Sequence, residues 1–500
     1  MDNQHPVSKE SPAVAAMRDG WNMYSALMAG TKGMREAGRN LLPQWPAEPK
    51  AVYEKRLATS TLFPAFKRTV IALASKPLSK PITLSEDMPD QIKEWMADVD
   101  RHGRNLDTFM TDVLESALSH GMALIMTEFP AVKKTAEDRT LTVAQEKAQR
   151  VRPYAVMIKP TQLIGFRVVD GRLAQLRYEE VVEELDGDFG AKEIKQIRVV
   201  EPGKWSVWRK ARSERGEELY AIHDEGINTL TEIPLAVVYG KRTGVLTSES
   251  PLREVCFLNI KHWQSQSDQD YLLHIARVPI LCAIGVDETF ELAVGGASAV
   301  KMPPNASLQF VEHSGAAIGA GQVSLDGLKE EMRQAGAELL VLRPAPATAT
   351  EVASDNAVGL SDMQRIALGA QDAINLMLDF FGQYAKIPKP GTAKLFVDFG
   401  ALTQAEASAN LVLSAQSAGI LSKSTALSEL KRRGIVSPDL DLDEEQDLID
   451  GEGPPVGNTD PITGLPYSKP VAPTAPGAKI DPHTGLPYTQ PVPPQVPGQK

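Results

Sequence analysis

Cysteine is scarce in this sequence, with only Cys256 and Cys282 among 500 residues. Two cysteines cannot make a disulfide framework, and their separation fits no zinc site, so we expect a reducing compartment such as the cytoplasm. Long hydrophobic runs are also lacking. The longest, at residues 278–286, is far shorter than the roughly 20 apolar residues of a membrane-spanning helix. The sequence therefore predicts neither an exported nor a membrane protein.

Motifs for catalysis and for nucleotide binding are missing as well. There is no phosphate-binding G-x-x-x-x-G-K-[ST] loop, and the glycine-rich residues 315–321 depart from the dinucleotide-binding spacing, so we interpret them as a flexible loop. The eight histidines form no H-E-x-x-H pair, and no serine lies in a G-x-S-x-G elbow. We therefore expect no metal, no cofactor and no enzymatic activity.

Positive charge is in deficit, because 53 Lys and Arg stand against 64 Asp and Glu, for a net charge of −11. Proteins that grip nucleic acid over a broad surface do so mainly through Lys and Arg that neutralise phosphates. The acidic balance excludes that mode of binding. It does not exclude contact with DNA. An acidic surface would repel the duplex instead of holding it.

The composition, with 42% hydrophobic and 23% charged residues, is that of a globular protein, and the length exceeds what one core usually organises. Up to residue 130 the apolar residues recur mainly at helical spacing, ending in a short apolar strand at residues 122–126. Between residues 154 and 239 the period shifts toward two, which predicts an antiparallel sheet. The sequence thus predicts an α+β protein.

A basic and aromatic patch lies within the predicted sheet. It has two alternative interpretations: a hairpin that contacts phosphates, or an exposed edge strand whose cations discourage aggregation. We favour the edge strand. The residues of this patch are Lys204, Trp205, Trp208, Arg209, Lys210, Arg212 and Arg215.

The second half of the chain returns to helical spacing. A long helix is predicted over residues 251–276, followed by short strands, a returning helix at residues 325–342, and a loop of small and hydroxylated residues at 343–356. Then come a long helix over residues 360–381, a strand at 394–399, and a terminal helical pair at 404–418 and 424–433.

The last part of the chain differs in kind. Residues 439–452 hold eight acidic and no basic residues, and residues 459–479 and 480–500 are two copies of a unit that reads Asp-Pro-x-Thr-Gly-Leu-Pro-Tyr. So many prolines cannot pack as helix or sheet, so we expect a disordered, extended tail. It is either a spacer or a linear motif displayed twice for a partner.

This order of elements resembles that of tailed-bacteriophage portal proteins, the rings at the capsid vertex through which DNA enters and leaves. Several short sequence stretches also resemble a portal-like phage family long described as of unknown function. The stretches concerned are Tyr53-x-x-Arg56-Leu57, Lys67-Arg68-Thr69-Val70, Ile233-Pro234, the run of residues 258–268 and Thr348-Ala-Thr350-Glu351.

The resemblance implies a portal fold with a wing of helices and strands, a two-helix stem, a small α/β clip, a tunnel loop with its helix, and a helical crown. The implied divisions are an N-terminal arm (1–50), wing (51–250), first stem helix (251–276), clip (277–324), second stem helix (325–342), tunnel loop and long helix (343–385), wing strand (386–403), crown (404–436) and tail (437–500).

The resemblance also implies a function. Portals are non-enzymatic dodecameric rings that pass double-stranded DNA during packaging and ejection, and they contact the terminase large subunit, the major capsid or scaffold protein, and a neck or tail adaptor. A virion location follows, with assembly in the host cytoplasm and no membrane. Alternatives are another virion protein, such as a neck adaptor or minor head protein, or an uncharacterised cytoplasmic enzyme.

Two sets of site residues follow from the resemblance. Large aromatic side chains on the polar first stem helix are expected to contact neighbouring subunits instead of a core within their own chain; these are Trp263 and Tyr271. The tunnel loop is expected to guide DNA along the channel through weak hydrogen bonds and repelling carboxylates. Its residues are Arg343, Thr348, Thr350, Glu351, Ser354 and Asp355.

Overall fold

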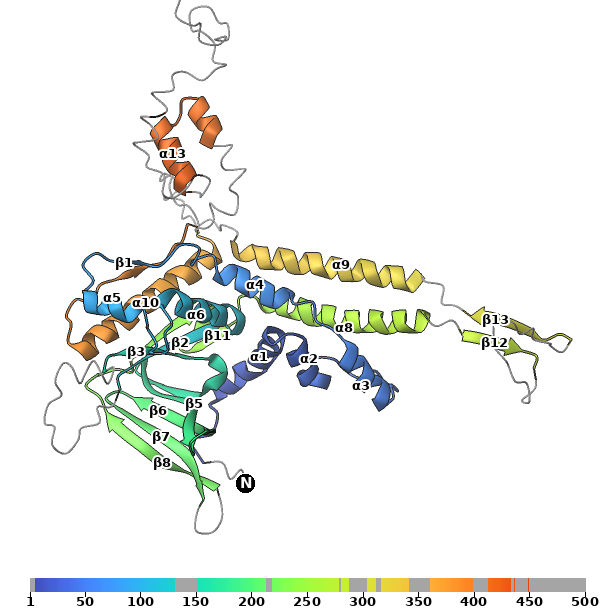
Figure 1. Ribbon diagram of the computed structural model, residues 1–500, viewed down its shortest axis with the longest axis horizontal. Helices are drawn as coiled ribbons and strands as arrows, with labels where there is room; N and C mark the ends of the chain where they lie inside the picture. Colours follow the sequence, from blue (N-terminus) through green and yellow to red (C-terminus); the bar gives the residue numbers. More distant parts are fainter. Residues whose placement is uncertain are drawn as a thin grey trace, which may run out of the picture. The chain divides into compact units, whose positions relative to one another are not determined.

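The computed structural model describes residues 5–130, 151–212, 218–277, 280–286, 304–311, 316–340, 360–398 and 412–432, together with residues 436 and 448. The chain divides into two units, Met1–Gly400 and Ala401–Lys500. The fold is mixed α+β, with all described strands paired antiparallel (Figure 1). Among the described helices, none combines the length and apolar character that crossing a bilayer requires.

The N-terminal part of the first unit is helical, as predicted. Its helices also include one 3-10 turn, Gly38–Asn40. Every α-helix of this part begins at or just after a Pro or Asn, except α2, which follows Gly30. The α-helices are α1 (Pro12–Met28), α2 (Thr31–Ala37), α3 (Lys50–Thr59), α4 (Ala65–Ala74), α5 (Asp90–Met96) and α6 (Leu106–His120).

A three-stranded sheet forms the centre of this unit, with β2 (Met122–Glu128) between β3 (Tyr154–Ile158) and β9 (Leu235–Tyr239). The first six residues of β2 are buried on both faces. Both α6 and the later helix α10 (Asp362–Ala385) pack on this strand. A strand covered on both faces needs apolar residues at every position instead of alternation, which explains the run predicted at residues 122–126.

A five-stranded meander follows in the order β4-β5-β6-β7-β8, the antiparallel sheet predicted from period two. Its strands are β4 (Leu163–Val169), β5 (Arg172–Asp186), β6 (Gly190–Glu201), β7 (Lys204–Arg212) and β8 (Glu218–Ile227). The expectation that the basic and aromatic patch is an edge strand is wrong, because β7 pairs with a strand on each side. β8 is rich in charged residues, so its alternation was too weak to predict.

The second half holds a pair of long helices joined by a hairpin. α8 (Arg253–Ala276) leads to the hairpin of β12 (Ile280–Ile284) and β13 (Ser307–Val311), and α9 (Ala316–Ala337) returns, ending in the 3-10 turn Glu338–Leu340 (Figure 1). The first stem helix was predicted over nearly the same residues. The returning helix was predicted to begin at residue 325, but it begins at Ala316.

The glycine-rich residues 316–321 are therefore helical, and the flexible-loop interpretation is wrong for them. The reason is packing against α8. A Cβ on Gly321 would lie 2.1 Å from Oε1 of Gln269, so glycine here leaves space for the buried Gln269 amide against α9. Interior helical glycine costs about 1 kcal/mol relative to alanine, and the contact with α8 offsets that cost.

Short strand pairs complete the first unit. β1 (Thr83–Leu84) pairs with β14 (Ala393–Lys394), and β10 (Lys241–Gly244) pairs with β11 (Thr247–Glu249). In the second unit, residues 412–417 are helical and α13 spans Lys423–Arg432. The predicted terminal helices thus have described counterparts, except for residues 404–411. Apart from residue 448, the acidic segment and the proline-rich repeats lie outside the described residues.

Candidate assembly site on the paired helices

α8 and α9 run antiparallel, side by side, within the first unit (Figure 1). Near the hairpin, Nε2 of Gln269 donates to the backbone carbonyl of Ile318 at 2.8 Å. Farther along the pair, His262 lies beside Lys329 and Asp326 of α9, and burial followed by the Lys329 charge lowers the pKa of His262. Contacts at these two levels hold the helices in one register.

Three polar side chains of α8 are buried, although such side chains are mostly exposed in proteins. Asn259, Ser267 and Gln269 are each at most 4% exposed. Every one of them finds a hydrogen-bond partner on another element. A buried polar group without a partner would cost about 1–3 kcal/mol. These hydrogen bonds therefore favour packing of α8 against the elements that supply the partners.

Asn259 completes the start of α4. That helix follows Pro64 and has no side-chain cap of its own. Oδ1 of Asn259 accepts from the Phe66 backbone N–H at 2.9 Å, and Nδ2 donates to the Phe63 carbonyl at 2.9 Å. The first N–H groups of a helix have no partner within it, so an amide from α8 supplies one across the interface.

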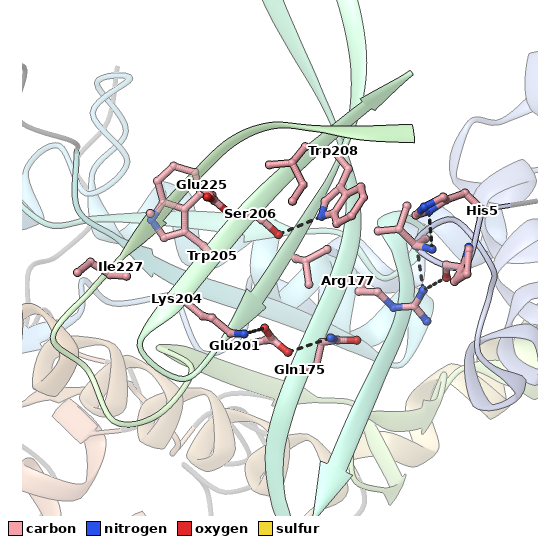
Figure 2. Close-up of a pocket in the computed structure, with 15 residues that line it drawn as sticks. His5, Gln175, Arg177, Glu201, Lys204, Trp205, Ser206, Trp208, Glu225 and Ile227 are labelled. Atoms are coloured by element: carbon pink, nitrogen blue, oxygen red, sulfur yellow. Dashed lines mark hydrogen bonds and ion pairs between the residues drawn. The ribbon is translucent and has the colours of Figure 1, made fainter. Parts of the chain in front are cut away.

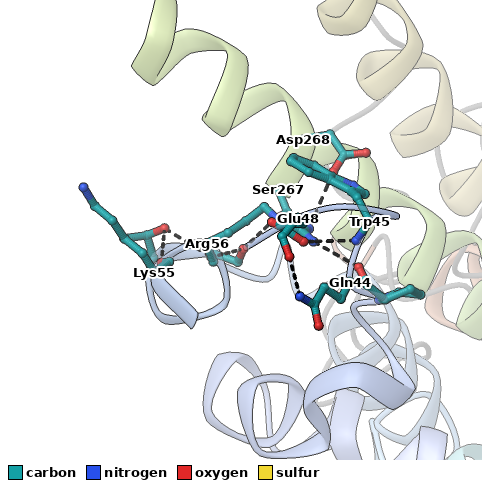
Figure 3. Close-up of polar contacts among 10 residues, drawn as sticks. Gln44, Trp45, Glu48, Lys55, Arg56, Ser267 and Asp268 are labelled. Carbon is teal, nitrogen blue, oxygen red and sulfur yellow. Dashed lines mark hydrogen bonds and ion pairs between the residues drawn. The ribbon is translucent and has the colours of Figure 1, made fainter. Parts of the chain in front are cut away.

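Arg56 is the centre of the polar contacts between α3 and α8 (Figure 3). Its guanidinium forms a bidentate pair with Glu48 and lies 4.1 Å from the centre of the Trp45 ring. Nη1 donates to Oγ of Ser267 at 3.3 Å and lies 3.7 Å from the half-exposed Asp268. Hydrogen bonding from Arg56 is the main cause that lowers the pKa of Glu48. Arg56, held by the buried pair with Glu48, thereby links α3 to Ser267 and Asp268 of α8.

Three of the stretches that carry the sequence resemblance contribute to these contacts. Arg56 of α3 bonds to Ser267 in residues 258–268 of α8, and Asn259 of the same stretch bonds to Phe66 of α4, just before residues 67–70. Sequence reasoning named these stretches but did not predict that Arg56, Glu48 and Asn259 form the contacts. The only signal in the sequence for a shared role was that all these stretches resemble the same family.

The two predicted interface aromatics have different surroundings. Trp263 is 0% exposed, so it belongs to the core of its own chain, and the expectation that it contacts a neighbouring subunit instead is wrong. Its apolar ring is buried by elements packed on α8. Tyr271 is half-buried and lies edge-on to Trp45, with ring centres 5.3 Å apart. It remains accessible from outside.

Tyr271 lines a groove between α3 and the C-terminal half of α8, with a volume of about 690 Å³. Apolar side chains, among them Val52 and Ile275, form part of this groove. Lys55 and Arg277 bring positive charge to it, against Asp270. A groove of mixed apolar and basic character can hold another polypeptide element. We name it the α3/α8 groove.

The predicted tunnel-loop residues Arg343, Thr348, Thr350, Glu351, Ser354 and Asp355 lie outside the described residues. The same holds for Arg215 of the basic and aromatic patch. Within the described ranges, no group of His, Cys, Asp and Glu side chains is arranged to hold a metal ion.

Lys204, Trp205 and Trp208 of that patch line a hollow of about 940 Å³ on the five-stranded sheet (Figure 2). Two cations of the patch are paired within the chain: Lys204 with Glu201 at 2.8 Å, and Arg209 with Glu184 at 2.7 Å. Trp208 contacts the N-terminal segment through His5, with ring centres 5.3 Å apart. The N-terminal segment, through His5, Pro6 and Val7, thus forms part of the wall of this hollow.

Comparison with known proteins matches residues 251–385 to the family described as Domain of unknown function (DUF4055). This span contains α8, the hairpin, α9 and α10, and it confirms the expected likeness to a family of unknown function for that part of the chain. No curated protein matches the chain.

Several solved structures are similar at low sequence identity. A chain of "Virion of native gene transfer agent (GTA) particle" is 11% identical, with 78% of this chain and 96% of that chain covered and a TM-score of 0.38. A chain of "Neck of native GTA particle computed with C12 symmetry" is 12% identical, with 73% of this chain and 89% of that chain covered and a TM-score of 0.39. A chain of "Neck of empty GTA particle computed with C6 symmetry" is 12% identical, with 80% of this chain and 98% of that chain covered and a TM-score of 0.40.

Proposed function

We propose that this protein is a non-enzymatic portal subunit. Copies of it form a ring, expected to be dodecameric, at one vertex of a phage-like capsid. The ring is the channel for double-stranded DNA during packaging and ejection, and it docks the terminase and the neck or tail proteins.

The observation that carries this proposal is the helix–hairpin–helix formed by α8, β12, β13 and α9. A pair of helices more than 20 residues long, joined by a small strand module, is the arrangement expected for a stem and clip. The stretches that resemble the portal-like family anchor this pair to α3 and α4 through Arg56 and Asn259. The motif residues therefore support the element on which a ring depends.

The elements before and after the pair support the same function. Helices and antiparallel strands up to residue 249 correspond to the expected wing, and β14 returns to pair with β1 in that region. The chain order is thus that of the resemblance, with the tunnel loop between α9 and α10 as the proposed channel segment.

The charge distribution suits a passage for DNA. The chain carries a net charge of −11. Carboxylates repeated around a ring would repel a polyanion and so prevent it from sticking to the wall.

Electron microscopy of the purified full-length protein tests the proposal. Rings with a central hole wide enough for duplex DNA, and with twelvefold symmetry, are the expected result. Particles that remain monomeric at micromolar concentration, or that assemble without a central hole, would contradict it. A monomer with a closed pocket would favour the enzyme alternative. A protein that forms rings only when bound to a ring of another protein would favour an adaptor.

A further inference from the structure

The α3/α8 groove has an apolar part that its own chain leaves open. Tyr271 is half-buried and Ile275 is 45% exposed, although both lie beside Val52 in the groove. Exposed apolar side chains that gather in a hollow mark a surface that binds a partner more often than scattered ones do.

α9 presents a second unoccupied surface. Val323 is 74% exposed, which is high for an apolar residue in the middle of a helix. Gly319 and Gly327, one turn to either side of it, have space around them: a Cβ on either would meet no atom within 4 Å. Val323 therefore stands as an isolated apolar projection on a flat helical ridge.

The two surfaces lie on opposite sides of α8. Ser267 contacts α3, whereas Gln269 contacts α9. These two residues are two positions apart, which is roughly 200° around an α-helix. α9 buries Leu325, Leu328 and Met332, so the ridge with Val323 faces away from the chain's own core.

The charges of the two surfaces are complementary. The cations Lys55 and Arg277 line the groove, with Asp270 as the acidic residue near them. The ridge carries Glu331 and Glu330 within two turns of Val323, although Glu330 already pairs with Arg333 at 2.8 Å. A basic groove on one side of a subunit and an acidic ridge on the other attract each other between copies.

We propose that the α9 ridge of one copy lies in the α3/α8 groove of the next copy, with Val323 inserted beside Val52, Tyr271 and Ile275. This rests on the proposed function, and it names the surfaces through which the ring closes. Because the two surfaces are different, the contact is head-to-tail, and a head-to-tail contact repeated with a closing rotation generates a ring.

Single substitutions test the two surfaces separately. Val323→Asp and Ile275→Asp each place a carboxylate in the proposed contact, and both residues are exposed within one chain, so the fold is expected to persist with unchanged circular dichroism. Each is expected to weaken association at least about 30-fold, as for a central interface residue, and so abolish rings in sedimentation and electron microscopy. Val181→Asp, on the 51% exposed Val181 of β5, is the matched control and should leave rings intact.

A mixture of the two variants gives the sharpest result. The Val323→Asp chain keeps an intact groove, and the Ile275→Asp chain keeps an intact ridge. Mixed together, they can form one normal contact and no second one, so heterodimers and no rings are expected. Mixtures that stay monomeric, or either variant alone forming normal rings, would overturn the proposed surfaces. Absence of rings in the unmodified protein would instead overturn the proposed function.

Discussion

The guanidinium of Arg56 and the carboxylate of Glu48 form a bidentate ion pair inside the protein, with Nε to Oε1 and Nη2 to Oε2 distances of 2.9 Å each. Their side chains are 3% and 1% exposed. Arg56 also donates to the Pro43 carbonyl and to Ser267. The pair therefore joins α3, the preceding loop and α8 in one network.

Removing one partner of this pair should be costly. Arg56→Met leaves the Glu48 carboxylate buried without its cation, and the free energy of unfolding should fall by about 3–5 kcal/mol. Lys55→Met, at the exposed neighbouring position, is the control and should change stability by less than about 0.5 kcal/mol. Urea titration measures both.

The double variant Glu48→Met/Arg56→Met separates pairing from burial. Two apolar side chains of similar size leave no uncompensated charge, so most of the lost stability should return. A double variant as unstable as Arg56→Met alone would mean that the hydrogen bonds to Pro43 and Ser267, and not the charge pair, hold this site together.

Gly321 should not tolerate even a methyl group. Its Cβ would displace the amide of Gln269, which is buried and bonded to Ile318, so Gly321→Ala should lower stability by about 1–2 kcal/mol despite the higher helix propensity of alanine. Gly319→Ala is the matched control on the same helix. Its Cβ meets nothing, so thermal unfolding of that variant should occur at the same or a higher temperature.

Trp263→Ala should destabilise the subunit itself. The ring is fully buried, and its Nε1 has no hydrogen-bond partner among the described residues, so the loss is mainly one of packing, about 3–5 kcal/mol. Tyr271→Ala should change unfolding less and weaken association more. If Trp263→Ala unfolded at the denaturant concentration of the unmodified protein, its placement in the core would be contradicted.

His120 should make stability depend on pH. It lies at the end of α6, with Ser25 Oγ 2.9 Å from Nε2 and Ser119 Oγ 2.8 Å from Nδ1, and burial, followed by the Lys159 charge, lowers its pKa from 6.5 to about 4. The unfolded chain takes up a proton near pH 6.5 while the folded protein keeps the ring neutral. The contribution is therefore complete above pH 6.5 and is lost as the pH falls to 4, by up to about 3 kcal/mol.

His120→Gln should flatten this dependence, because an amide does not titrate. The test compares the free energy of unfolding at pH 7 and pH 4.5 for the unmodified protein, for His120→Gln, and for His223→Gln on the exposed face of β8 as control. Equal slopes for all three proteins would show that another group causes the acid sensitivity.

The tunnel-loop segment can be tested through its charge. Thr350→Lys/Glu351→Lys should leave rings intact and slow DNA packaging, with recovery at higher salt, because lysines repeated around the channel bind phosphates. Thr350→Ser/Glu351→Gln, which adds no cation, is the control. Normal packaging by the lysine variant at low salt would place this segment away from the DNA.

Helices and strands whose bounds depend on nearby residues in the sequence could be predicted. α8 follows Pro251 and ends before Pro279, and these two prolines bound the predicted helix. β2 could be predicted because a strand covered on both faces is apolar throughout. The candidate site was less accessible, because the polar residues of α8 look solvated in sequence, whereas Ser267 meets Arg56 across 211 positions of the chain.

Two wrong predictions have the same cause. The glycine-rich start of α9 has the composition of a loop, yet it is helical, and Gly321 within it packs closely against Gln269 of α8. β7 has the cations of an edge strand, yet β8 pairs with it through nine positions. The composition of a segment indicates the structure that it favours in isolation. In both places a partner that is distant in sequence, or only weakly patterned, determines the structure that forms.

Gly321 and Gly336 together prevent α9 from sliding along its neighbours. A Cβ on Gly336 would lie 2.8 Å from Thr69 Cγ2 of α4, and one on Gly321 would meet Gln269 of α8. A slip of one turn, about 5.4 Å, would bring larger side chains to both points at once. The helix pair should therefore behave as a stiff strut that transmits axial load from the hairpin to the sheet-bearing part of the chain, with little lost to internal shear.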